Sequence, residues 1–121
     1  MYGDFASAFR KCWACGWRQG WRSWCLSNLE IAHIVGGAGR RHDRRAIVRL
    51  CNGCHLLNHG ARIVVAGVRL PTLDLGHLVW LKREWDQEHL DIPYLMSLRV
   101  KRAEVIEPVE LPEWFLVQRS N

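Results

Sequence analysis

A chain of 121 residues, 49% of them hydrophobic, forms one domain with a modest core that a bound metal would help to stabilise. Its formal net charge is +5, and it shows neither a signal-peptide pattern nor the run of roughly 18 apolar residues that a membrane-spanning helix needs. We therefore expect a cytoplasmic protein without a membrane partner.

The charges are unevenly distributed along the chain. Residues 1–62 contain ten Lys or Arg against three acidic residues, which gives +7, and residues 63–121 contain seven against nine, which gives −2. A basic half followed by a mildly acidic one indicates a polyanionic partner on one face of the molecule.

The first predicted elements are two strands and a helix. Leu26–Val35 is apolar and β-branched enough for a strand, and a glycine- and arginine-rich loop at 36–45 follows it. Ala46–Leu50 is expected to form a second, short strand. A helix over Asn52–His59 is then predicted to begin at the second pair of cysteines.

The second half of the chain is predicted to add a hairpin, two short helices and an extended tail. Ile63–Val65 and Val68–Leu70 flank Ala66-Gly67, a pattern typical of a two-residue hairpin turn. One helix is expected to start with Thr72 as its N-cap, and another to run from Asp91 to about residue 100. The tail contains prolines among acidic residues and is expected to pack through four hydrophobic side chains: Val105, Ile106, Trp114 and Phe115.

Four of the five cysteines form two CxxC pairs, Cys12 with Cys15 and Cys51 with Cys54. A structural zinc ion takes four ligands in a closed tetrahedron, and thiolates serve well. The alternatives are two unrelated pairs of buried thiols and, less favoured, a redox pair. Cys25 lies outside both pairs and is predicted to be a small buried side chain rather than a ligand.

Two histidines follow the second CxxC pair directly. His55 and His59 are four residues apart, so on a helix both would lie on one face, as shared metal binding requires. The alternative is a pair of surface histidines with a coincidental spacing.

The segment from Cys12 to Gly60 resembles the HNH endonucleases, in the subset with a CxxC…CxxC zinc site that is common in tailed bacteriophages. The resemblance rests on a CxxC pair, a strand ending in His33, a loop, and a strand leading into LCNGCHLLNHG. It implies an α+β fold in a single domain. A zinc-bound ββα-metal core would span about 9–61, with a hairpin, helices and an extended tail over 62–121.

The resemblance also implies an activity. The protein would be a metal-dependent endonuclease that hydrolyses phosphodiester bonds in double-stranded DNA, encoded by a phage or prophage and acting in the bacterial host cytoplasm. A phage terminase or packaging protein is a second partner implied by analogy. His33 would be the general base, and His55 and His59 would bind a catalytic Mg²⁺, Mn²⁺, Zn²⁺ or Ni²⁺ ion. Four arginines would hold phosphates beside the site: Arg40, Arg41, Arg44 and Arg45.

Two positions depart from the family pattern. Ala32 stands where a metal-binding His or Asp usually precedes the base, and Ala46 stands where an Asn usually ties the loop. Glu30, on the same strand face as Ala32, could supply the missing ligand, as could His42 or Asp43. Two alternatives remain: His33 itself binds the metal, or the chain is a non-catalytic zinc module that binds DNA or a packaging protein.

Seven tryptophans are unusual in a chain of 121 residues. Four of them are spaced by four, four and three positions: Trp13, Trp17, Trp21 and Trp24. Packing is the favoured interpretation, because an indole buries much surface in a small domain. The alternative is a base-stacking surface with Arg18 and Arg22.

Overall fold

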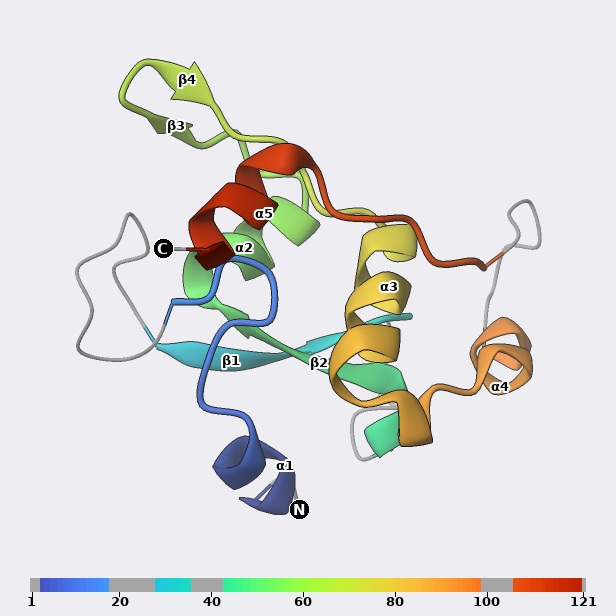
Figure 1. Cartoon of the computed structure of the whole chain (residues 1–121). Coiled ribbons are helices and arrows are strands. Elements are labelled where there is room, and N and C mark those ends of the chain that lie inside the picture. The colour runs from blue at the N-terminus through green and yellow to red at the C-terminus, as the bar shows by residue number, and fades with distance from the viewer. Residues whose placement is uncertain (1–2, 18–27, 36–42, 99–105, 121) are drawn as a thin grey trace.

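Two short antiparallel strands, β1 (Leu29–His33) and β2 (Ile47–Cys51), form the centre of the fold (Figure 1). The computed structural model describes residues 3–17, 28–35, 43–98 and 106–120. The register pairs Leu29 with Cys51 and His33 with Ile47. The strands occur in the predicted order, although β1 is shorter than expected and β2 begins and ends one residue later.

Helix α2 (Asn52–Asn58) follows β2 without a connecting loop. The Asn52 N–H donates to the Asn28 carbonyl (3.1 Å), so the strand ladder continues into the first residue of the helix. At the other end of the ladder, the Ile34 N–H donates to the Ala46 carbonyl (2.8 Å). Backbone bonds therefore close both ends of the strand pair, and the predicted strand–strand–helix unit is present.

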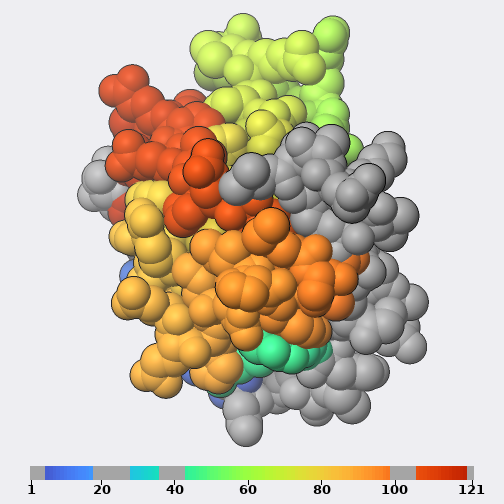
Figure 2. All heavy atoms as spheres, turned by 90° about the vertical axis from the view of Figure 1, so that its right-hand side faces the viewer, coloured from blue at the N-terminus to red at the C-terminus, as the bar shows by residue number. Residues whose placement is uncertain are grey.

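The remaining elements surround this unit. Helix α1 (Gly3–Ala8) lies below the strands in Figure 1 and α2 lies above them, while α3 (Leu75–Trp85) packs against β2. The 3-10 turn η2 (Arg44–Ala46) precedes β2, and α4 (Ile92–Ser97) packs beside it, as Figure 2 shows from the side. The 3-10 turn η3 (Gln87–His89) connects α3 to α4. Among the described residues, no helix combines the length and apolarity that crossing a membrane requires.

The predicted hairpin is confirmed. Strands β3 (Val64–Val65) and β4 (Val68–Arg69) pair antiparallel around Ala66 and Gly67. Both turn residues have positive φ (52° and 79°), as a type I′ turn requires, and glycine accepts this conformation without steric cost. The hairpin projects from the body of the molecule (Figure 1).

Two predictions for the second half are wrong. Helix α3 begins at Leu75 rather than near Thr72, because Asp74 is the N-cap and its N–H donates to Nδ1 of His77 (2.8 Å). The tail is not extended throughout, since it ends in helix α5 (Glu113–Ser120). Its packing was predicted correctly for Ile106 and Phe115, which are both buried, whereas Val105 lies outside the described residues.

The tail lies across the start of α3 at Gly76. The Val109 N–H donates to the Gly76 carbonyl (2.9 Å), and a Cβ at Gly76 would lie only 2.6 Å from Cγ2 of Val109. Any side chain there would displace the tail, so the absence of one lets the C-terminal segment cover the helix.

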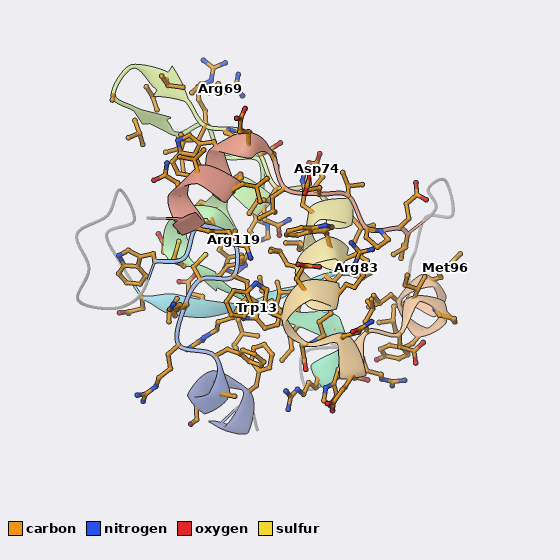
Figure 3. All side chains as sticks on the ribbon, viewed as in Figure 1. Trp13, Arg69, Asp74, Arg83, Met96 and Arg119 are labelled. Carbon is orange, nitrogen blue, oxygen red and sulfur yellow. The ribbon has the colours of Figure 1, made fainter. Side chains whose placement is uncertain are left out.

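The core is centred on Trp13, which points inward between the N-terminal segment and α3 (Figure 3). Its ring stacks on Trp85 with 6.0 Å between centroids and meets the edges of Phe5 (5.5 Å) and Phe9 (4.9 Å). These contacts attach α1 and the first CxxC pair to α3. Packing is therefore confirmed for Trp13, as it is for the buried Trp17. Trp21, Trp24, Arg18 and Arg22 lie outside the described residues.

A buried ion pair joins α3 to the start of β2. Nζ of Lys82, which is fully buried, donates to the carbonyls of Arg44 (2.7 Å) and Ile47 (2.9 Å) and to Oδ2 of Asp86 (2.7 Å). Arg44 donates two further bonds to Asp86 (3.1 and 3.2 Å). Burial opposes ionisation of Asp86, yet hydrogen bonds from Arg44 and Lys82 outweigh it and hold the pKa of that carboxyl below its usual value.

Replacing Asp86 by Asn should destabilise the fold by about 3–5 kcal/mol, because it leaves the buried Lys82 charge without an oppositely charged partner. The stabilisation from ionised Asp86 is present above the unfolded pKa of about 3.9 and is lost as the pH falls through the lower folded pKa. Urea unfolding across this acidic range should therefore show a smaller pH dependence for Asp86→Asn than for the wild type.

Asp74→Asn is the matched control, because Asp74 is exposed and Asn caps helices about as well as Asp. It should change stability by less than about 0.5 kcal/mol. An equal loss of stability in the two variants would show that the buried ion pair stabilises the fold no more than an exposed carboxylate does.

Candidate metal centre

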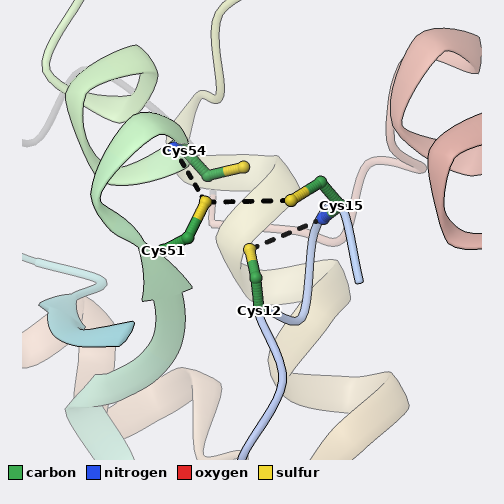
Figure 4. A group of neighbouring side chains, drawn as sticks. All are labelled: Cys12, Cys15, Cys51 and Cys54. Atoms are coloured by element: carbon green, nitrogen blue, oxygen red, sulfur yellow. Dashed lines mark hydrogen bonds between the residues drawn. The ribbon is translucent and has the colours of Figure 1, made fainter. Parts of the chain in front are cut away.

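Four cysteines from two distant parts of the chain meet in the interior (Figure 4). Cys12 and Cys15 come from the loop after α1, Cys51 ends β2, and Cys54 lies in the first turn of α2. Their sulfur atoms all lie within 4.8 Å of one another, and all four residues are buried. Among the described residues, no other group of three or more His, Cys, Asp or Glu brings its ligand atoms together in this way.

The spacing of the Cys15 and Cys51 sulfurs suits two ligands of a tetrahedral metal ion. Sγ of Cys15 lies 3.7 Å from Sγ of Cys51. Four thiolates at the usual metal–sulfur distance of about 2.3 Å would be about 3.8 Å apart. The backbone N–H groups of Cys15 and Cys54 point at the sulfurs of Cys12 (3.5 Å) and Cys51 (3.4 Å), which stabilises negative charge on them. The four cysteines are therefore positioned to bind a metal ion.

Backbone bonds hold the first CxxC turn against β2. The Cys12 N–H donates to the Trp17 carbonyl (2.7 Å), and the Gly16 N–H to the Cys12 carbonyl (2.9 Å). The Trp13 N–H donates to the Arg49 carbonyl (2.9 Å), while Nε of Arg49 donates to the Phe9 carbonyl (3.0 Å). The turn thus has a fixed position next to the second pair. Cys25 lies outside the described residues.

A second cluster lies where β1 meets α2. Oε1 of Glu30 is 2.8 Å from Nδ1 of His55, and Nδ2 of Asn52 donates to Oε2 of Glu30 (3.3 Å). The ring centroids of His55 and His59 are 4.9 Å apart, so the predicted histidine pair does share one side of α2. Glu30, expected to be a candidate metal ligand, contacts one of these histidines.

His33 is the last residue of β1, and its side chain is half-buried. Side chains alternate along a strand, so His33 and Glu30 lie on opposite faces of β1. Ala32 shares the face of Glu30 and is fully buried. The role of His33 as a base stays a prediction.

Arg44 and Arg45 both have carboxylate partners within the protein. Arg44 pairs with Asp86, as described above, and its guanidinium lies over Phe5 and Phe9. Arg45 pairs with Asp43 (2.8 Å) and Asp91 (3.4 Å) and lies 3.4 Å from the ring centre of Tyr94.

Arg44 thus connects η2 to the end of α3, and Arg45 connects η2 to the start of α4. The hydrogen bond from Arg45 holds the pKa of Asp43 well below its usual value, so this carboxylate stays ionised as the partner of Arg45. Contact of Arg44 or Arg45 with phosphates stays a prediction. Arg40, Arg41 and His42 lie outside the described residues.

The buried ion pair of Lys82 and Asp86, which also binds Arg44, was not predicted from the sequence. Lys82 and Asp86 are four residues apart on α3, a spacing that brings opposite charges together on a helix. The same spacing is common on solvated helix faces. Burial of this pair depends on tertiary contacts that the sequence pattern does not reveal.

Comparison of the chain with known proteins gives no match: no protein-family model, no curated protein and no solved structure is significantly similar to it.

Replacing any one of the four clustered cysteines by Ser should remove the bound metal, because a closed four-ligand site loses a quarter of its ligands. We expect native mass spectrometry to find one zinc ion per wild-type chain and none in Cys12→Ser or Cys54→Ser. Cys25→Ser is the matched control and should keep its zinc. Metal loss in the control together with retention in Cys12→Ser would contradict the ligand assignment.

Proposed function

We propose that this chain is a zinc-bound, metal-dependent DNA endonuclease of the HNH type. The observation that carries the proposal is the strand–strand–helix unit in which the fourth cysteine is followed directly by His55. His59 lies beside His55 on α2, and Glu30 reaches His55 from β1. This is the order of elements and ligand-type residues that the resemblance to HNH endonucleases implies.

The ion in the cysteine cluster is proposed to be zinc. Four thiolates in a closed, buried tetrahedron are typical of structural zinc sites, which leave no position open for a substrate. Its role would be to join the N-terminal segment to β2 and α2. The catalytic ion would be a different one, held by His55 and His59.

The three histidines would have two different roles in cleavage, metal binding and proton transfer. A divalent ion at His55 and His59 would stabilise negative charge on the phosphate and the leaving oxygen. His33 would accept the proton of the attacking water, a role that suits an imidazole near neutral pH. Because His33 and Glu30 lie on opposite faces of β1, replacing His33 would not disturb the contact between Glu30 and His55.

Duplex DNA is the proposed substrate because the first half of the chain is strongly basic. Arg44 and Arg45 are poor residues for testing this, since their replacement would also break ion pairs with Asp86 and Asp43. Arg40 and Arg41, in the same basic stretch of the sequence, are the residues to replace in measurements of DNA affinity against salt.

A second candidate function is a non-catalytic module that binds DNA or a phage packaging protein such as a terminase. The observation that favours it is the complete burial of Ala32 and Ala46, at the two positions where the HNH pattern has polar residues. An apolar Ala32 supplies no metal ligand. In the HNH pattern, an Asn at the position of Ala46 stabilises the loop between the two strands. Here the backbone hydrogen bond from Ile34 to Ala46 joins the two ends of that segment.

Cleavage of supercoiled plasmid in Mg²⁺ or Mn²⁺, and its absence in EDTA, would support the nuclease. His33→Ala should then abolish cleavage without changing the bound zinc, because the base is needed only to deprotonate water. His59→Ala should lose cleavage through weaker metal binding, and excess Mn²⁺ should partly restore it.

His77→Ala is the matched control, since His77 lies at the start of α3 and should not affect cleavage. If the wild type binds DNA but cuts it with none of Mg²⁺, Mn²⁺, Ni²⁺ and Zn²⁺, the enzyme is rejected and the non-catalytic module remains.

A further inference from the structure

The carboxylate of Glu30 has a partner for each of its oxygens. Oε1 lies 2.8 Å from Nδ1 of His55, and Oε2 accepts a hydrogen bond from the side-chain amide of Asn52 (3.3 Å). The Glu30 and His55 side chains are 37% and 24% exposed, so the pair is partly shielded from water. Each carboxylate oxygen of Glu30 therefore already contacts one neighbouring side chain.

The backbone fixes this arrangement. Glu30 is paired with Leu50 across the strands, and α2 begins two residues after Leu50. Asn52 and His55 are three residues apart in the first turn of α2 and therefore lie on the same side of the helix. The bond from the Asn52 N–H to the Asn28 carbonyl (3.1 Å) holds that turn beside β1.

The chemistry of the pair determines which ring nitrogen of His55 is free. An ionised carboxylate only accepts hydrogen bonds, so Nδ1 of His55 must carry the proton in the bond to Oε1. In the neutral ring, Nε2 then carries the lone pair that a metal ion needs. Metal-binding histidines are commonly oriented by a carboxylate in this way.

We propose that Glu30 is a positioning residue and not a metal ligand. It holds His55 in the Nδ1–H form, so that Nε2 is the metal-binding nitrogen, and Asn52 holds Glu30 in place. This inference rests on the proposed role of His55 in binding the second metal. It replaces the expectation that Glu30 supplies the ligand missing at Ala32.

The tautomer of His55 can be read without any measurement of cleavage. In full-length protein containing its structural zinc, long-range ¹⁵N–¹H spectra at a pH of about 8, above the ordinary imidazole pKa, distinguish Nδ1–H from Nε2–H. We expect Nδ1–H for His55 in the wild type and a shift of the population towards Nε2–H in Glu30→Ala.

The affinity of the second site is measured by titrating Mn²⁺ into the same samples, with paramagnetic broadening of the His55 signals locating the ion. Glu30→Ala should weaken Mn²⁺ binding by about 10–100-fold. Glu30→Gln retains a carbonyl oxygen that accepts from Nδ1–H, so its Mn²⁺ affinity should fall by a smaller factor. Asn52→Ala should also show a smaller loss of Mn²⁺ affinity than Glu30→Ala. Glu84→Ala, which removes an exposed carboxylate on α3, should leave the Mn²⁺ affinity unchanged.

The outcomes separate this inference from the nuclease proposal. An Nε2–H form in the wild type, no Mn²⁺ binding near His55, or unchanged tautomer and affinity in Glu30→Ala would each overturn the inference, even if the protein cuts DNA. The expected tautomer and Mn²⁺ affinities in a protein that cuts no DNA would sustain the inference while the nuclease fails.

Discussion

The junction of the four cysteines is the constraint on which the rest of the structure depends. It brings the N-terminal loop to the point where β2 becomes α2, although 35 residues separate Cys15 from Cys51 in the sequence. Thiolates this close would repel one another in a buried site, and a divalent cation removes that repulsion. Trp13 lies inside the first CxxC turn, so the same junction places the ring on which α1 and α3 pack.

The proposed site depends on this junction through the chain itself. Cys54 is adjacent to His55, and the sulfur of Cys51 caps the first turn of α2. A metal ion that fixes these cysteines also fixes the turn that presents His55 to Glu30. Binding of the structural ion and orientation of the proposed catalytic histidine are therefore expected to be coupled, although the two groups perform different tasks.

The sequence was informative where a local pattern decides the structure. The CxxC spacing, the Ala66-Gly67 turn and the strand–helix order each depend on neighbouring residues, and the structure agrees with them. The start of α3 was predicted wrongly because Thr72 and Asp74, only two residues apart, can each act as an N-cap. Helix α5 was missed because the prolines that precede it are also typical of an extended tail. The partners of Glu30 and Arg44, and the contact of Arg45 with Asp91, were not predictable, since they lie on other elements and only tertiary packing brings them near.

X-ray absorption at the zinc edge of the purified chain, loaded with one zinc ion per molecule, tests the central claim most directly. A single ion held by the four cysteines predicts a ligand shell of four sulfur atoms at about 2.3 Å with no nitrogen or oxygen. A shell containing nitrogen or oxygen, or fewer than four sulfurs, would contradict the account, because the ion would then lie outside the junction that organises the fold.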